Sequence, residues 1–177
     1  MINAVVTAAV LIINFILQTT VLQLIEIRGV IPDTMLIIIV SYSLLRGQNA
    51  GAAVGFFAGL LYDIFFGSAL GFYALLGMLT GYLCGIAHRN FYRENYVLPV
   101  TLSAIASFVT GLVIYVTGFL LKGNYNVFYF LFSVIIPQAV YTGIAAIVVY
   151  RILYSVNNGV EKKEKEKRRL FYFSVKE

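Results

Sequence analysis

The sequence predicts an all-α protein, a polytopic membrane bundle of about six transmembrane helices. Hydrophobic residues make up 60% of the 177-residue chain and charged residues only 12%, about half of the charged share in soluble proteins. The mean hydropathy is +0.88. Most of the apolar residues also gather into runs that are long enough to cross a bilayer core of about 30 Å.

Six apolar segments follow one another along the chain. They are residues 2–25, 31–45, 48–66, 69–87, 97–121 and 126–150. The second segment is doubtful as a span, because its roughly 15 helical residues would rise only about 23 Å. It is therefore either buried among its neighbours or joined closely to the third segment. The bundle occupies residues 1–152 in this interpretation, and residues 153–177 form a short basic tail.

Basic residues predict the orientation of the bundle. If all six segments span, one face carries Arg46, Arg89, Arg93, Arg151 and the basic cluster of residues 162–169. The opposite face carries only Arg28 and Lys122. Because Lys and Arg concentrate in cytoplasmic loops, both termini are predicted to be cytoplasmic.

The third segment has a glycine at every fourth position. The series is Gly47, Gly51, Gly55 and Gly59, and its next two steps are Asp63 and Gly67. In lipid, small residues at this spacing let two helix backbones approach closely. The fourth segment repeats the pattern with Gly77, Gly81 and Gly85. We expect the two small-residue faces to pack on each other, although the helix of a partner protein could use the same face.

The glycine series winds around its helix, because four residues turn an α-helix by about 400°. From Gly47 to Asp63 the drift is about 160°. Either one helix crosses this stripe at a right-handed angle, or two helices contact its two ends. Asp63 then lies in the outer part of the bilayer, where an ionisable group is costly. Asp33 lies level with it and follows Pro32 at the start of a helix, where the dipole favours a carboxylate.

The chain carries no residue pattern typical of a catalytic site. His88 is the only histidine and Cys84 the only cysteine, and two potential ligands do not make a closed zinc site. No nucleotide-binding motif is present. We therefore expect no enzyme activity, cofactor or metal, and the short tail of mixed charge argues against nucleic-acid binding. Asn14 and Gln18, one turn apart, are expected to bond neighbouring helices.

The stretch from Pro32 to Gly85 resembles the rod shape-determining protein MreD family. The pattern consists of Pro32, Asp33, Arg46, Gly47, Gly51, Gly55, Gly59, Asp63, Gly67 and Gly71, followed by Gly77, Gly81 and Gly85. The resemblance implies a non-enzymatic protein of the bacterial inner membrane that works in cell elongation. It implies association with the MreC protein and, through the complex, with the actin-like MreB filament and the peptidoglycan polymerase and transpeptidase. The ten residues from Pro32 to Gly71 are then expected to form a partner or packing face.

The same resemblance offers an alternative function. The family is similar in layout to the substrate-binding subunits of energy-coupling-factor vitamin transporters. Asp33, Asp63 and Gln23 would then line a ligand cavity. The small pair Ala4 and Ala8 resembles the alanine motif by which such subunits contact their coupling protein. Both functions stay open at this point.

Overall fold

The structure is a computed structural model that describes residues 2–20, 26, 29–67, 70–90, 97–120 and 130–174. The regular structure of these residues is helical, which confirms the all-α prediction. The α-helices are α1 (Ile2–Thr20), α2 (Thr34–Arg46), α3 (Gln48–Phe66), α4 (Phe72–Ile86), α5 (Val97–Tyr115) and α7 (Ile136–Ser174). A 3-10 turn, η2 (Ala87–Asn90), follows α4, and two π turns, η3 (Val116–Leu120) and η4 (Leu131–Ile135), follow α5 and precede α7.

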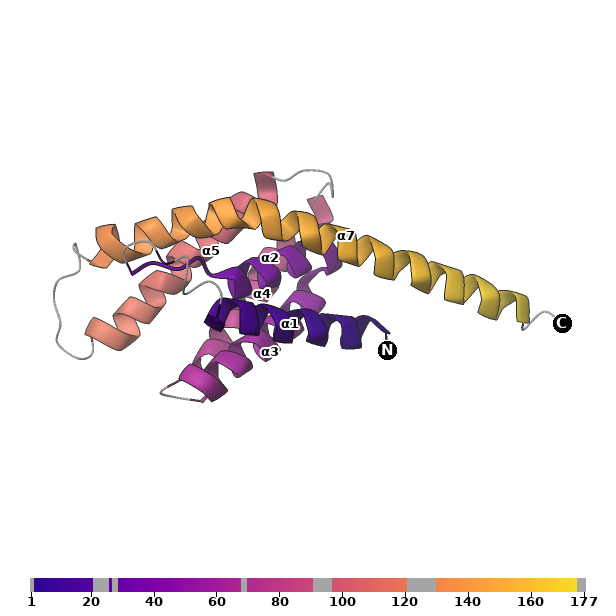
Figure 1. Cartoon of the computed structure of the whole chain (residues 1–177), viewed down its shortest axis with the longest axis horizontal. Coiled ribbons are helices and arrows are strands. Elements are labelled where there is room, and N and C mark those ends of the chain that lie inside the picture. Colours follow the sequence, from indigo (N-terminus) through magenta and orange to yellow (C-terminus); the bar gives the residue numbers. More distant parts are fainter. Residues whose placement is uncertain are drawn as a thin grey trace.

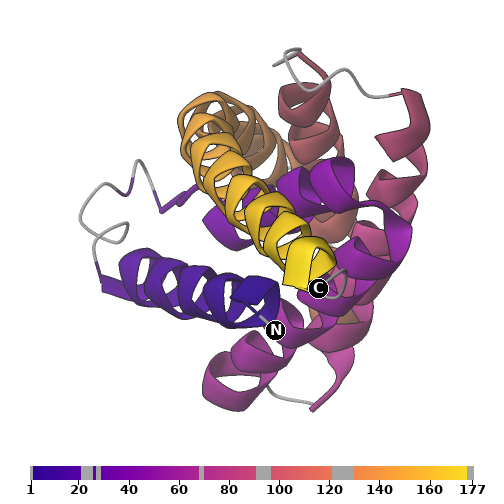
Figure 2. The same cartoon turned by 90° about the vertical axis from the view of Figure 1, so that its right-hand side faces the viewer.

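Successive helices of the described chain run back and forth along the bundle, so both termini lie at one end (Figure 1). We call this end the terminal end. The view from it shows α2 surrounded by the other helices (Figure 2). Side-chain contacts agree with this course: Gln18 near the end of α1 bonds Thr34 at the start of α2. The short connections from α2 to α3 and from α3 to α4 favour this antiparallel order.

Helix α2 forms the centre of the bundle. It contacts α1, α3, α4, α5 and α7, and eleven of its 13 residues are buried. A helix of this length rises only about 20 Å, too little to cross a bilayer by itself. Both expectations for the second segment therefore hold together, because α2 is enclosed by its neighbours and is separated from α3 by Gly47 alone.

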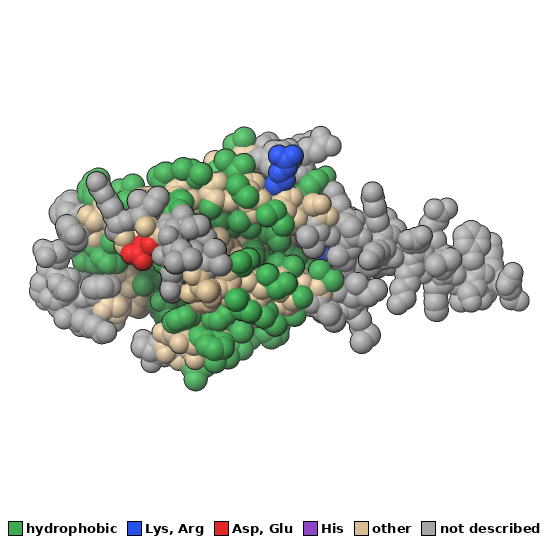
Figure 3. All heavy atoms as spheres, viewed as in Figure 1, with side chains coloured by type: hydrophobic (Ala, Val, Ile, Leu, Met, Phe, Trp, Pro, Cys, Tyr) green, Lys and Arg blue, Asp and Glu red, His purple; other side chains and the backbone are tan. Residues whose placement is uncertain are grey.

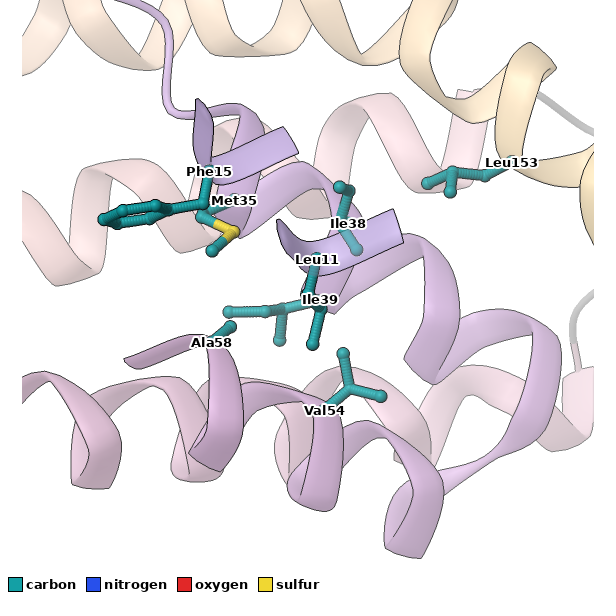
Figure 4. Close-up of a cluster of buried hydrophobic side chains, with 8 residues drawn as sticks. All are labelled: Leu11, Phe15, Met35, Ile38, Ile39, Val54, Ala58 and Leu153. Carbon is teal, nitrogen blue, oxygen red and sulfur yellow. The ribbon is translucent and has the colours of Figure 1, made fainter. Parts of the chain in front are cut away.

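Two groups of buried side chains hold α2 on opposite sides. The first joins it to α1, α3 and α7 through Leu11, Phe15, Met35, Ile38, Ile39, Val54, Ala58 and Leu153 (Figure 4). The second joins it to α4 and α5 through Leu36, Val40, Leu44, Cys84 and Ala106. Cys84 is a buried free thiol within this apolar packing.

Three helical stretches in the described chain have the length and apolar character of a membrane span: Gln48–Phe66, Val97–Gly118 and Leu131–Ser155. The apolar stretches Val6–Thr20, Thr34–Arg46 and Phe72–Ile86 are shorter. The fourth segment was thus predicted too long, since α4 begins after Gly71 rather than at residue 69. Large apolar side chains cover the flanks of the bundle (Figure 3). Lipid satisfies such a surface, whereas exposed apolar patches of this extent are rare on soluble monomers, so this is an integral membrane protein.

Helix α7 is the longest helix, with 39 residues. It extends well beyond the other helices at the terminal end (Figure 1). Its backbone stays helical past residue 153, where the sequence analysis placed the start of the tail. The basic cluster of residues 162–169 therefore lies on the helical extension.

Candidate functional site

The glycine series of α3 lies against α4. A methyl group added at Gly55 would come within 2.0 Å of the carbonyl oxygen of Gly77, and one added at Gly77 within 2.3 Å of the Gly55 oxygen. Gly51 and Gly81 face each other in the same way. The expected packing of the two small-residue faces is thus confirmed by backbone-to-backbone contact.

One helix covers most of the winding stripe. After Gly51 and Gly55, Gly59 lies against the backbone of Tyr73 in α4. At the other end of α4, Gly85 approaches the backbone of Gln48. Two separate helices are therefore not needed, because α4 follows the stripe along its length. A partner helix could reach Gly55 or Gly59 only by displacing α4.

The turn between α2 and α3 consists of a single residue with a left-handed backbone. Gly47 has φ +89°, a conformation that side chains with a Cβ rarely adopt. Its N–H donates to the Ser43 carbonyl over 2.8 Å and so ends α2. The imidazole of His88 lies beside Gly47, with Nδ1 2.6 Å from the Leu44 carbonyl oxygen. His88 thus ties the end of α4 to this turn.

Asp63 closes the opposite end of the α3–α4 pair. Its Oδ2 accepts hydrogen bonds from the N–H groups of Gly71 and Ala74 over 3.0 and 2.9 Å, and Oδ1 accepts one from Tyr73 over 3.0 Å. These are N–H groups at the start of α4, which have no partners within their own helix. A carboxylate is also favoured there by the helix dipole. Asp63, which is only 3% exposed, therefore caps the next helix in the chain.

Gly71 and Gly67 make this cap possible. Gly71 has φ +100°, which turns its N–H toward Asp63. Gly67 ends α3 by donating its N–H to the Asp63 carbonyl over 3.1 Å. A methyl group on Gly67 would lie 2.7 Å from the Asp63 backbone.

Asp33 caps α2 within a cluster of polar side chains. Its Oδ1 accepts from the N–H of Leu36 over 3.0 Å and from Nε2 of Gln18 over 3.5 Å. Gln18 Oε1 accepts from the Thr34 hydroxyl over 2.8 Å and from the Met35 N–H over 2.9 Å. Gln18 therefore fastens α1 to the first turn of α2, which confirms the expectation that it bonds a neighbouring helix.

The polar cluster reaches three more helices. Nε2 of Gln18 donates to the hydroxyl of Tyr62 in α3 over 2.6 Å. The Asp33 N–H donates to the hydroxyl of Thr142 in α7 over 3.1 Å. Ser107 of α5 lies 3.5 Å from the same hydroxyl. Side chains from five helices thus meet at the end of the bundle opposite the termini.

A small hollow adjoins this cluster, between α2, α3, α4 and α5. Asp33, Tyr62, Tyr73, Thr80 and Thr110 supply its polar lining, and its volume is about 70 Å³. Pockets for drug-sized molecules typically have volumes of about 300–1,000 Å³. The hollow therefore has the size of a water site.

A comparison with known protein families decides what kind of protein this is. The sequence model of the rod shape-determining protein MreD family matches residues 1–158 of the 177. The chain belongs to the MreD family. No curated protein and no solved structure matches the chain. The resemblance seen from Pro32 to Gly85 is thus confirmed over a longer stretch, and the chain is a rod shape-determining membrane protein.

In this MreD-family chain, the structure separates the ten expected residues into three groups. Pro32 and Asp33 begin α2 beside the polar cluster. Arg46 and Gly47 form the turn at the terminal end, where the Arg46 guanidinium lies 5.3 Å from the centre of the Tyr42 ring. The others lie along or close the α3–α4 contact: Gly51, Gly55, Gly59, Asp63, Gly67 and Gly71.

Several residues that make the contacts described above were not predicted from the sequence. Tyr62 and Thr142 join the Asp33 cluster, and Ser43 packs against Gly51. Thr142 could have been noticed in the sequence, because it is the only threonine in the apolar segment of residues 126–150. Gln23, Arg28 and Lys122 lie outside the described residues, as do the side chains of Ala4, Arg89 and the basic tail.

Proposed function

We propose that the protein is a non-catalytic membrane component of the bacterial cell-elongation machinery. In this proposal it associates with an MreC-like protein and, through it, with an MreB-like filament and the peptidoglycan polymerase and transpeptidase. The family match over residues 1–158 carries the proposal. Its role would be to help couple the cytoplasmic filament to wall synthesis outside.

The hydrogen bonds of the described carboxylates within the bundle support a protein that works by binding partners. Both oxygens of Asp63 accept hydrogen bonds from the backbone of α4. Asp33 caps α2 and bonds Gln18. These side chains hold helix ends in place, which is a structural role. We therefore propose that the ten residues from Pro32 to Gly71 form an internal packing face that gives partners a rigid bundle to bind.

The proposed location is the bacterial inner membrane, with both termini in the cytoplasm. The charges of the described side chains support this orientation. The Lys and Arg atoms of Figure 3 lie toward the terminal end, and the Asp and Glu atoms lie toward the other end. Basic groups favour the cytoplasmic side. The division into a bundle, residues 1–152, and a basic tail, residues 153–177, stays a prediction.

The experiment combines depletion with co-purification in the bacterium that encodes the chain. We expect cells to become round on depletion and to recover with the wild-type chain. An affinity-tagged chain should co-purify an MreC-like protein from detergent extracts. A rod of normal width after depletion, together with no MreC-like protein in the eluate, would contradict the proposal.

A photocrosslinking scan would locate the partner-binding face. Exposed positions on three helices serve as probes: Leu83 on α4, Ile105 on α5 and Val148 on α7. We expect one of these faces to give a crosslink to the MreC-like protein. Tyr150 serves as the internal control, because its side chain on α7 is fully buried and an aromatic photoprobe of similar size there should give none.

The alternative function is a substrate-binding subunit of a vitamin transporter. It needs a ligand cavity at the end opposite the termini, and the hollow beside Asp33 is the candidate. At about 70 Å³ it holds water-sized molecules. Mass spectrometry of the purified protein tests the alternative, because a stoichiometric vitamin would favour it over the elongation role.

A further inference from the structure

A groove runs between α1 and α3 on the side of α3 that α4 does not cover. Its volume is about 530 Å³. Ala8 of α1 and Ala50 and Ala53 of α3 are among the residues that line it. The groove stays open because these alanines do not fill the space between the two helices.

The groove has a polar end and an apolar length. At the polar end, near the termini, the hydroxyl of Thr7 bonds that of Tyr42, and the Arg46 guanidinium lies over the Tyr42 ring. From there the lining becomes apolar through Phe57 to Ile64. Ala50 and Ile64 are fourteen residues apart, about 21 Å along the helix. That length covers one leaflet of a hydrocarbon core about 30 Å thick.

This arrangement fits an amphipathic molecule with a negative head. The cation stands at one end of the groove, near the level of a headgroup, and the apolar trough leads from it into the leaflet. Basic pockets between helices bind anionic lipid headgroups in this way. A guanidinium has five N–H donors, so it can hold a phosphate and keep its contact with Tyr42.

The size of the groove argues against a transmembrane helix as the occupant. A helix with side chains is about 10–12 Å wide, so 21 Å of it fills on the order of 1,600 Å³ or more. The groove offers about 530 Å³, so a helix seated on it would project well beyond it and leave the space between α1 and α3 unfilled. A flexible acyl chain is much thinner and can follow the trough.

We propose that the groove binds one anionic phospholipid from the leaflet at the terminal end. One of its two acyl chains lies between α1 and α3, and its phosphate contacts Arg46. The lipid would fill the space that the small residues leave and so complete the packing of α1. This inference rests on the groove alone and does not depend on the proposed role in cell elongation.

The test is native mass spectrometry of the full chain, reconstituted from detergent into vesicles of equal parts phosphatidylglycerol and phosphatidylcholine. We expect one retained phosphatidylglycerol per chain. Ala8→Phe fills the groove and should lower this retention at least about fivefold. Ala9→Phe is the matched control, because Ala9 is also exposed on α1 but does not line the groove, and its retention should equal that of the wild type.

A second pair of variants tests the charge. Arg46→Gln should lower the preference for phosphatidylglycerol over phosphatidylcholine about fivefold, the effect of one cation at an anionic surface. Arg151→Gln, an exposed cation on α7, should leave the preference unchanged. The proposal is overturned if the wild type retains no lipid, if Ala8→Phe and Ala9→Phe behave alike, or if Arg46→Gln keeps the preference.

Discussion

Helix α3 has small residues on two faces, and the two faces pack differently. On one face, Gly51 and Gly55 touch the backbone of α4. On the other, Ala50 and Ala53 line an open groove beside α1. The same helix therefore takes part in the closest helix contact described in this chain and in one of its loosest.

The difference lies in the partner helix. Helix α4 offers Gly77 and Gly81 at the positions that meet the glycines of α3. Helix α1 also has a small residue, Ala8, at the groove, but it packs on α3 through the larger side chains of Leu11 and Phe15. Small residues thus produce close packing only where both helices have them at matching positions. Helix α1 is held instead by side-chain hydrogen bonds, above all those of Gln18.

The largest predicted effect comes from adding a side chain to the face of α3 that packs on α4. Gly55→Leu places a side chain where even a Cβ lies 2.0 Å from the Gly77 oxygen. Because the obstacle is backbone, it cannot rotate away, and the cost should exceed the roughly 1–3 kcal/mol typical of overpacked cores. We expect little folded protein, measured as the monodisperse fraction after detergent extraction.

The matched control for this change is Ala53→Leu on the open face. Ala53 is exposed in the groove, so the added atoms have room. We expect a folded protein whose unfolding midpoint lies close to that of the wild type. If both leucine variants behaved alike, the two faces of α3 would not differ as the contacts indicate.

The second predicted effect concerns the cap that closes the glycine contact. Asp63→Leu leaves three N–H groups of α4 without the acceptors that they have in the structure. We expect a loss of about 3 kcal/mol in the free energy of unfolding, because each buried unpaired group costs about 1–3 kcal/mol. Thermal unfolding in detergent would measure it.

Asp63→Asn removes the charge and replaces one of the two acceptor oxygens with an amide nitrogen. The amide keeps one acceptor oxygen, so the loss should be about 1–2 kcal/mol. Glu26→Gln is the control, because Glu26 is exposed and should show no change. An Asp63→Leu variant as stable as the wild type would show that the cap does not hold α4.

The sequence was sufficient to predict the helical bundle and the α3–α4 contact. Hydropathy marks each apolar segment locally, and a glycine at every fourth position allows close approach of helices. The pairing of Gly55 with Gly77 was accessible because both series lie in adjacent segments. The position of Arg46 beside the α1–α3 groove could not be predicted from the sequence, since it depends on how three helices are placed relative to one another.

The role of Asp63 shows why the rest could not be predicted. From the sequence, Asp63 was expected in a partner or packing face or, in the alternative function, in the lining of a ligand cavity. The structure instead gives it the N–H groups of α4. These N–H groups belong to the backbone, so no residue type in the sequence marks them as the partners of Asp63. The same holds for the Asp33 N–H and its acceptor Thr142, which are 109 residues apart.

The third predicted effect tests how α1 is held. Gln18→Leu keeps similar bulk but removes four hydrogen bonds, those to Asp33, Tyr62, Thr34 and Met35. Because interhelical bonds in membranes average about 0.6 kcal/mol, the expected loss is about 2 kcal/mol. Hydrogen exchange of α1 and the unfolding midpoint in detergent would measure it.

Asn14 provides the control for this change, one turn earlier on the same helix. Its Nδ2 is buried and has no hydrogen-bond partner among the described residues. Asn14→Leu therefore removes an unpaired polar group and should leave the stability unchanged or raise it. If Asn14→Leu destabilised α1 as much as Gln18→Leu, general packing would hold this helix, and the contrast between the two sides of α3 would lose its basis.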